Sequence, residues 1–211
     1  MIGSLALGLS FIFSLFASTA TALGLKLREE RLIESGRRAL ISTFILSTMA
    51  CFRLVWAFLR DEFSIKYVAS YSSSDLPIAY KIAALWAGQE GSLLLWFWLL
   101  TLFSAILISA HRRGDEIVDN SLPVLALIQL FFSSLLAFLC RPFERSPLPR
   151  EEGQGLNPLL QNPYMILHPP TLYMGYVGFA IPFALGVGAL LAGGREGEWT
   201  RRSRDWAMIS W

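Results

Sequence analysis

Five long apolar stretches constrain the fold of this 211-residue chain more than any other feature. A transmembrane helix needs about 20 mostly apolar residues to cross a hydrocarbon core roughly 30 Å thick. Backbone groups in lipid must pair within their own segment, so such stretches fold as helices. The expected spans are residues 4–25, 39–59, 92–110, 121–140 and 171–192, and a sixth apolar run begins at residue 206. We therefore predict one all-α membrane domain over residues 1–211, a polytopic transmembrane helix bundle with five complete spans and the start of a sixth.

The composition excludes several other classes of protein. Hydrophobic residues make up 54% of the chain and charged residues 16%, so a soluble domain would lack the polar surface to cover its core. Disordered chains have the opposite bias, with few hydrophobic residues and a high net charge. The formal net charge of +2 gives no indication of a nucleic-acid partner. The expected surroundings are membrane lipid.

The distribution of Lys and Arg predicts the orientation, because positive charges gather in cytoplasmic loops. With the N-terminus outside, eleven positive residues lie in inner segments and six in outer loops. The inner residues are Lys26, Arg28, Arg31, Arg37, Arg38, Arg112, Arg113, Arg195, Arg201, Arg202 and Arg204, and the outer ones are Arg60, Lys66, Lys81, Arg141, Arg145 and Arg150. We therefore expect an extracytoplasmic N-terminus and extracytoplasmic loops at residues 61–91 and 141–170.

His168 is the first candidate functional residue. It lies in the outer segment GLNPLLQNPYMILHPPTLY (residues 155–173), directly before Pro169 and Pro170. Proline is favoured in the first turn of a helix, so we expect the fifth span to begin there, with His168 at or just before its N-terminus. The helix dipole at that position favours a neutral imidazole, which can bind a metal ion or be an axial ligand of haem iron. A structural role is the alternative, and His111 is expected on the other side of the membrane.

The second candidate is the segment AALWAGQEGSLLLWF (residues 83–97), where the third span begins. Two glycines flank Glu90, and Trp86 and Trp96 are expected near the outer boundary of the membrane. Such a segment can be an aromatic belt with a helix start, in which Glu90 is favourable at the positive end of the helix dipole. It can also pack a large planar group, because glycine allows a close approach. The residues by themselves leave both interpretations open.

Arg53 is unusual because it lies inside the second expected span. An intramembrane charge faces the protein interior, reaches the interface through its long side chain, or serves a functional site. Position 53 is about two helical turns from the outer end of the span, which is within reach of the interface. We expect either a structural ion pair or a contact with an anion.

Taken together, these segments resemble the CcmF-type haem lyases of cytochrome c maturation, within the CcmF/NrfE/CcsA haem-handling superfamily. Residues 86–96 are similar to the family's WxGxEGSLLLW stretch, and residues 61–80 resemble the segment that precedes it. The LNPLLQNP run at 156–163, the HPP triplet at 168–170 and the YMGYVG run at 173–178 also match in order and approximate spacing. The resemblance extends over almost the whole chain.

The resemblance implies a role in attaching haem to apocytochrome c on the extracytoplasmic face of a bacterial inner membrane. In this family haem b is the substrate, and it can also be a resident cofactor of the complete protein. The expected partners are the haem chaperone CcmE, the apocytochrome-handling proteins CcmH and CcmI, and apocytochrome c, whose CxxCH motif forms thioether bonds with the haem. His168, by its HPP context, matches an axial ligand of haem iron. Trp86, Glu90 and Trp96 are candidates for packing around the haem.

The sequence departs from the family pattern at its end. It stops at Trp211, before the Trp-rich haem platform and the further haem-ligating histidines of the family. We therefore expect an N-terminal portion whose haem lyase reaction needs a missing C-terminal part or a second subunit, and no independent catalysis. Two other functions stay open, namely a membrane transporter such as a haem exporter, and a non-catalytic assembly subunit.

Overall fold

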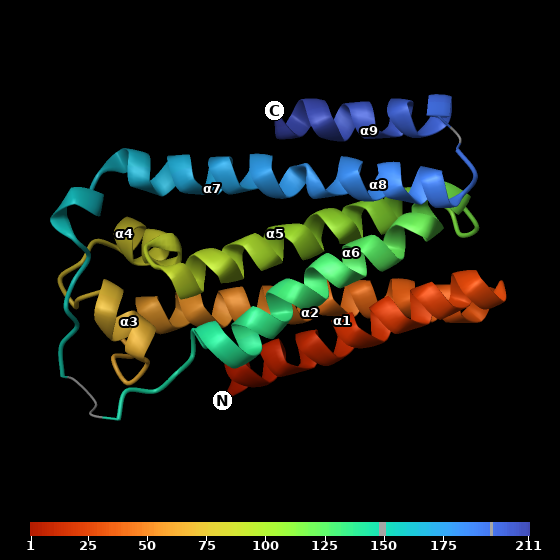
Figure 1. Cartoon of the computed structure of the whole chain (residues 1–211). Coiled ribbons are helices and arrows are strands. Elements are labelled where there is room, and N and C mark those ends of the chain that lie inside the picture. The colour runs from red at the N-terminus through yellow and green to blue at the C-terminus, as the bar shows by residue number, and fades with distance from the viewer. Residues whose placement is uncertain (148–150, 195) are drawn as a thin grey trace.

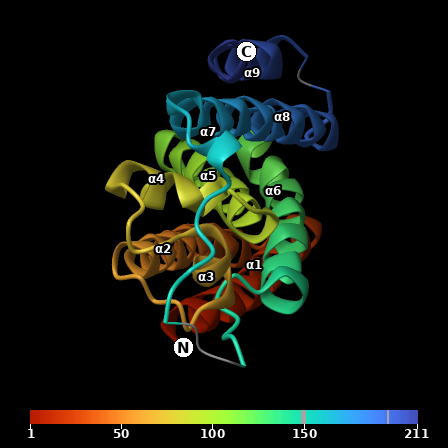
Figure 2. The same ribbon diagram turned by 90° about the vertical axis from the view of Figure 1, so that its left-hand side faces the viewer.

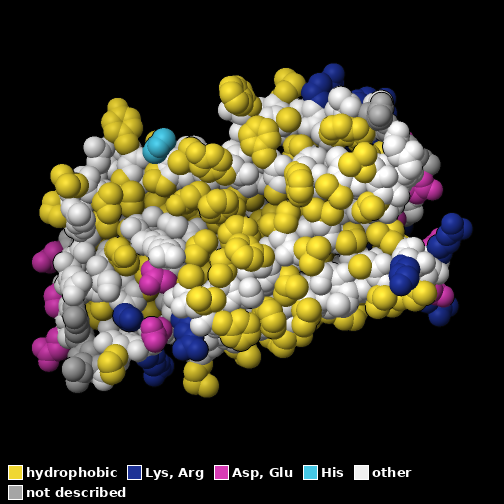
Figure 3. All heavy atoms as spheres, viewed as in Figure 1, with side chains coloured by type: hydrophobic (Ala, Val, Ile, Leu, Met, Phe, Trp, Pro, Cys, Tyr) yellow, Lys and Arg dark blue, Asp and Glu magenta, His cyan; other side chains and the backbone are white. Residues whose placement is uncertain are grey.

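The computed structural model describes residues 1–147, 151–194 and 196–211. Its long helices lie side by side in one bundle (Figure 1). Five helical stretches are long and apolar enough to cross a membrane. The described residues form no strand, and Ile65 and Arg145 pair as an isolated antiparallel bridge. Hydrophobic side chains cover the middle of the visible face, and charged side chains gather towards its two ends (Figure 3). The predicted all-α membrane bundle is therefore confirmed.

Helices α1 (Ile2–Leu27) and α2 (Glu30–Leu59) form a closely packed antiparallel hairpin. Small residues let the two backbones approach, since a Cβ on Gly36 would overlap the Thr21 side chain. Arg28 ends α1 in the left-handed conformation, with φ at 55°. The N–H of Glu29 then bonds back to the Gly24 carbonyl at 2.9 Å. Such close packing is what holds helices together in lipid, where apolar surfaces gain nothing from leaving water.

The centre of the bundle consists of α5 (Gln89–Ala110) and α6 (Glu116–Ser134), which continues as a π-helical turn, η2 (Leu135–Cys140). Helix α5 packs against α2, where the hydroxyls of Ser47 and Thr101 share a buried hydrogen bond of 2.8 Å. The Trp98 indole N–H of α5 also donates to the Thr48 hydroxyl of α2 at 3.0 Å. The buried core along α5 consists mainly of Leu, Ala, Ile, Val and Phe side chains.

Helices α7 (Pro163–Gly178) and α8 (Ala180–Leu191) follow one another along the side of α5 and α6. Helix α9 (Glu196–Ser210) then folds back over them, so that α7 and α8 lie between α9 and the rest of the bundle (Figure 2). Trp206 of α9 reaches Phe103 of α5, with ring centroids 5.8 Å apart. Arg202 of α9 forms an ion pair with Asp115, the N-cap of α6.

One end of the bundle carries the N-terminus and two long connecting segments, residues 60–88 and the described parts of 141–162 (Figure 1). We call it the loop end, and the opposite end, with the short connections, the turn end. The loop end contains α3 (Lys66–Tyr71), α4 (Ile78–Ala83) and the 3-10 helices η1 (Ala84–Trp86) and η3 (Pro158–Leu160). A buried ion pair of 2.6 Å between Lys81 and Asp61 ties α4 to the end of α2. The Gln154 N–H donates to the Ala69 carbonyl at 2.7 Å, so described residues of the second segment pack against the first.

Arg53 has the structural ion pair that was one of its two predicted roles. Its Nη2 lies 2.6 Å from a carboxylate oxygen of Glu62, directly after α2. The N-terminus and both long segments share one end of the bundle, which is the arrangement that the predicted orientation requires. The side of the membrane that this end faces stays a prediction. Arg150 and Arg195, which entered the charge count, lie outside the described residues.

Candidate functional site

His168 lies in the second turn of α7 and not at its N-terminus. The helix begins at Pro163, and the Asn162 side chain caps it by accepting a hydrogen bond from the Tyr164 N–H at 3.0 Å. The expectation that the helix begins at the later proline pair is therefore wrong. Asn162-Pro163 supplies a capping side chain and a proline at the first helical position six residues earlier. The helix-dipole argument, which applies to the first turn, does not extend to His168.

The His168 side chain is exposed, and apart from Thr171 the exposed side chains around it on α7 are largely apolar. Tyr164, Leu167 and Leu172 expose 78%, 68% and 42% of their surface. The Thr171 hydroxyl donates to the His168 carbonyl at 2.8 Å, whereas no hydrogen bond to the imidazole is found among the described residues. A free imidazole within an apolar surface is suited to ligating the metal of a planar, largely apolar molecule.

The second histidine lies far from the first. His111 follows the last residue of α5 at the turn end, where its Nδ1 is 2.9 Å from the Leu107 carbonyl. His168 lies in the second turn of α7, which starts at the loop end (Figure 1), so the two imidazoles do not share a metal ion. In the part of the chain that the structure describes, no group of three or more His, Cys, Asp or Glu residues could hold a metal ion. Because the sequence has only these two histidines, His168 is the one imidazole that this chain offers near the loop end.

Trp86 contacts the turn of α7 that precedes His168. Its indole Nε1–H donates to the Met165 carbonyl at 2.8 Å. The Trp86 carbonyl in turn accepts a hydrogen bond from the Ser92 hydroxyl, at 3.1 Å, in the first turn of α5. Trp86 thus links the start of α5 to the start of α7.

Trp96 contacts α7 farther along the same side. Its ring centroid is 5.8 Å from that of Tyr173 on α7 and 5.3 Å from that of Phe132 on α6. The Trp96 ring therefore fills the space where α5, α6 and α7 meet. Both predicted tryptophans pack against the helix that carries His168. Packing of either ring against haem stays a prediction.

The two glycines beside Glu90 are required by packing within the protein. A Cβ on Gly88 would overlap the ring of Tyr71. A Cβ on Gly91 would overlap the Leu85 carbonyl oxygen and the Tyr67 hydroxyl. The close approach that glycine allows is used here by tyrosine rings and backbone, which supports the interpretation of this segment as a structured helix start.

Glu90 is half-buried at the beginning of α5. Burial of Tyr71, and then the charge of Glu90, raise the pKa of the Tyr71 hydroxyl, so Glu90 lies on the side that faces α3. Among the described residues, Glu90 has no hydrogen-bond or ion-pair partner, and no such contact joins it to His168. The structure therefore brings Trp86 and Trp96 against the His168 helix and, among the described residues, shows no hydrogen bond or ion pair between Glu90 and that helix.

Two parts of this site were missed by the sequence reasoning. The Asn162 cap could have been found, because an Asn-Pro pair before an apolar run is a helix-start signal. The role of the Met165 carbonyl could not, because backbone acceptors carry no sequence signal and its donor is 79 residues away along the chain. Tertiary contacts of this kind appear in the fold alone.

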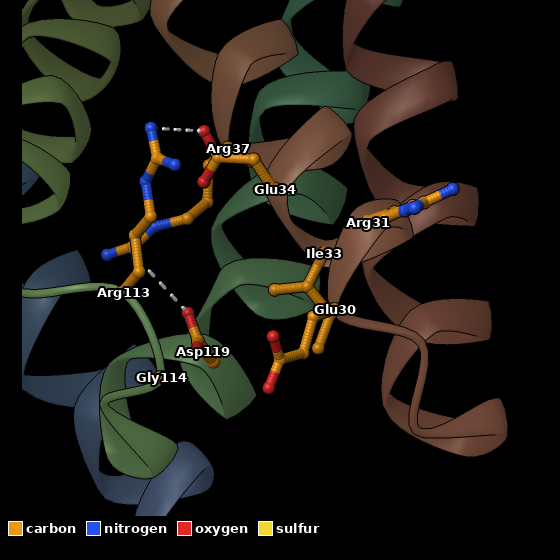
Figure 4. Close-up of a pocket in the computed structure, with 8 residues that line it drawn as sticks. All are labelled: Glu30, Arg31, Ile33, Glu34, Arg37, Arg113, Gly114 and Asp119. Carbon is orange, nitrogen blue, oxygen red and sulfur yellow. Dashed lines mark ion pairs between the residues drawn. The ribbon is translucent and has the colours of Figure 1, made fainter.

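A pocket of about 310 Å³ lies at the turn end, far from His168 (Figure 4). Arg37 of α2 and Arg113 of the α5–α6 turn lie close together there, each directed at a carboxylate. Arg37 is 3.6 Å from Asp119, and Arg113 is 3.0 Å from Glu34. Arg37 is 4% exposed and also donates to the carbonyls of the two residues that follow α5, at 3.4 Å. These charges join α2 to the α5–α6 turn. The lining residues are Glu30, Arg31, Ile33, Glu34, Arg37, Arg113, Gly114 and Asp119.

Comparison with known proteins connects this architecture to one family. The chain is 39% identical over 212 residues to the cytochrome c-type biogenesis protein CcmF of Pseudomonas aeruginosa, and 38% identical over 210 residues to CcmF of Escherichia coli. The alignments cover 100% and 98% of this chain, and 32% of each relative. The cytochrome c-type biogenesis protein NrfE of Haemophilus influenzae is 39% identical over 168 residues, which are 79% of this chain and 26% of that protein.

A solved structure has the same fold. The structure named Cytochrome c Heme Lyase CcmF matches 100% of this chain with a TM-score of 0.84 and 30% sequence identity, and the match covers 33% of that protein. The chain thus spans about a third of the length of these relatives. The family model described as Cytochrome C assembly protein matches residues 86–211, a region that begins at Trp86 and includes all of α5 to α9. This chain therefore belongs to the cytochrome c assembly protein family.

Proposed function

We propose that this chain takes part in cytochrome c maturation, and that His168 is an axial ligand of haem iron while haem is attached to apocytochrome c. The observation that carries this proposal is the exposed imidazole on an apolar face of α7, without a hydrogen-bond partner among the described residues. Histidine is a common axial ligand of haem iron, and an apolar surface around it suits a porphyrin. Membership in the cytochrome c assembly protein family supports the same reaction.

In this proposal haem b is the substrate, and His168 holds and orients it. The two thiols of a CxxCH motif in apocytochrome c add across the two haem vinyl groups, so each S–H and C=C pair becomes one thioether bond and one C–H bond. His168 supplies one iron ligand, and we assign the opposite ligand to another part of the assembly, because His111, the other histidine of the sequence, lies at the turn end. Because the chain spans about a third of its relatives, we assign the lyase reaction to the complete assembly and the ligand role to His168 within it.

We further propose that the loop end faces the extracytoplasmic side of a bacterial inner membrane. Two features support this orientation: the bias of Lys and Arg along the chain, and the placement of the N-terminus and both long segments at one end. His168 near that end would then meet haem delivered by a chaperone of the CcmE type. Apocytochrome c would arrive there on proteins of the CcmH and CcmI type.

The test is a His168→Ala substitution in the complete assembly, with His111→Ala as the matched control. Both variants remove one imidazole, but His111 lies at the other end of the bundle. His168→Ala is expected to abolish formation of holocytochrome c, measured by covalent haem staining, while membrane insertion stays normal. His111→Ala is expected to retain attachment. Normal covalent haem attachment in His168→Ala would overturn the ligand role.

A haem-binding measurement separates this proposal from a purely structural assembly role. Haem absorbance of the purified wild type and His168→Ala proteins is compared after haemin is added. Loss of the haem spectrum in the variant supports iron ligation by His168. An identical spectrum in both proteins would favour the assembly role instead.

A further inference from the structure

The two prolines after His168 remove hydrogen-bond donors from the middle of α7. In an α-helix each N–H donates to the carbonyl four residues earlier. Pro169 and Pro170 have no N–H, so they leave the carbonyls of Met165 and Ile166 without that intrahelical partner. The Trp86 indole N–H donates to the Met165 carbonyl at 2.8 Å. The indole thus takes the place of the donor that Pro169 lacks.

The position of Trp86 is well defined, because the backbone around it is hydrogen-bonded to the buried Tyr67 hydroxyl. Tyr67 is 5% exposed. Its hydroxyl lies 3.2 Å from the carbonyls of Ala84 and Leu85, to which it can donate, and it accepts the Gly88 N–H at 3.0 Å. Burial raises the pKa of Tyr67, so the hydroxyl keeps its proton. The backbone on both sides of Trp86 is therefore held by one side chain.

The hydrogen bond from Trp86 to the Met165 carbonyl lies close to His168 along α7. Met165 lies three residues before His168, which is slightly less than one helical turn. Helices kink where their hydrogen-bond ladder is interrupted, and proline is the usual cause. A bond to a carbonyl within the interrupted turn limits that bending and sets the rotation of the turn that follows. The turn that follows carries the imidazole.

We infer that Trp86 is a positioning residue for His168, which acts through the Met165 carbonyl and fixes the direction in which α7 presents the imidazole. This inference rests on the proposed role of His168 as an iron ligand. Trp86 donates its indole N–H to protein backbone, so its effect on haem is indirect. Trp96 packs against the same helix farther along α7, at Tyr173.

The experiment removes and then restores the hydrogen bond to Met165. Trp86→Phe keeps an aromatic ring but loses the N–H. Pro169→Ala introduces a backbone N–H that can donate to the Met165 carbonyl, so the double variant Trp86→Phe/Pro169→Ala regains the bond by another route. Trp98→Phe is the matched control, because the Trp98 indole N–H donates to the Thr48 hydroxyl at 3.0 Å, away from α7.

The first measurement is haemin affinity, taken from the Soret absorbance of each purified variant in lipid nanodiscs. Trp86→Phe is expected to bind haemin about tenfold more weakly, the effect of losing roughly one hydrogen bond. The Trp98→Phe control and the double variant are expected to stay within about twofold of the wild type. The second measurement is amide hydrogen exchange over residues 164–173. Exchange there should be faster in Trp86→Phe, return towards wild type in the double variant, and be unchanged in His168→Ala.

The outcomes separate this inference from the function on which it rests. If His168→Ala lost haemin binding but Trp86→Phe bound haemin as the Trp98→Phe control does, the positioning role would be wrong and the ligand role would stand. Failure of Pro169→Ala to restore affinity in the double variant would also overturn the positioning role. If His168→Ala bound haemin as tightly as the wild type, the proposed function and this inference would both fall.

Discussion

His168 and Trp86 belong to the same helix contact, yet their side chains have opposite environments. The imidazole is exposed and has no hydrogen-bond partner among the described residues, whereas the indole donates its N–H to backbone. A side chain without a protein partner is free to bind a ligand, and one whose polar group is already paired serves the fold. By this criterion His168 is a ligand candidate at the loop end, and Trp86 and Trp96 pack against the helix that carries it.

The sequence could predict His168 and Arg53 as special residues, because a histidine before two prolines and an arginine within an apolar stretch both stand out. It could not choose between the two interpretations of the glycine-flanked Glu90 segment. That choice depends on what a Cβ would meet, and the neighbours of Gly88 are Tyr71 atoms 17 residues away. Contacts of that kind follow from the fold.

Gly91 lies too close to its neighbours to accept a larger side chain. Gly91→Ala places a methyl group against the Leu85 carbonyl and the Tyr67 hydroxyl, so overpacking should destabilise the protein by about 1–3 kcal/mol. The measurement is the midpoint of thermal unfolding in detergent. Gly8→Ala is the control, because a Cβ on Gly8 of α1 meets nothing within 4 Å and removes only backbone freedom. An equal effect of the two substitutions would contradict the packing role of Gly91.

The apolar stretches predicted that each membrane-spanning helix exists, but they predicted the ends of these helices less well. Helix α2 begins at Glu30, although its apolar stretch begins at residue 39. Its polar first turns are stabilised by ion pairs of Glu34 with Arg38 and with Arg113, at 3.0 Å each. A hydropathy pattern does not predict such ion pairs. Helix α9 likewise begins at Glu196, ten residues before its apolar run. Helix α7 begins at Asn162-Pro163 because that pair caps a helix and the later prolines do not.

The ion pair between Asp115 and Arg202, which joins α9 to α6, should depend on pH. Partial burial raises the pKa of Asp115, but hydrogen bonds from Arg202 and from the Val118 N–H outweigh it, so the pKa is lowered below its usual value. A carboxyl whose pKa is depressed in the folded state stabilises that state above its unfolded pKa, and this contribution is lost as the pH falls through the folded value. The Asp115 ion pair should therefore hold α9 at neutral pH and release it in acid.

Amide hydrogen exchange over residues 196–210 measures this effect. Protection of α9 should decrease as the pH falls below about 4, the region where an ordinary Asp titrates. Asp115→Asn should already show the reduced protection at neutral pH and should lose the dependence on acid. Wild-type protection that stayed constant across this range, after correction for the intrinsic exchange rate, would argue against the ion pair as the tether of α9.

The whole molecule has two dissimilar ends joined by an apolar middle (Figure 3). At the loop end, ion pairs such as Lys81 with Asp61 hold ordered polar segments against the helices, and α7 presents His168 close by. At the turn end, Arg37 and Arg113 join the short connections. Because we propose that haem chemistry takes place at the loop end, this end must face the extracytoplasmic side. The lysine and arginine pattern predicted that orientation, but helix packing is the same for either orientation.

Cysteine labelling in intact cells can determine which side of the membrane the loop end faces. In a background with Cys51→Ala and Cys140→Ala, Leu159→Cys places a thiol at the exposed η3 of the loop end, and Glu29→Cys places one at the exposed α1–α2 turn. A membrane-impermeant maleimide, added after permeabilisation of the outer membrane, is expected to label Leu159→Cys in intact cells and Glu29→Cys only after lysis. The reverse pattern would put His168 on the cytoplasmic side and contradict the account.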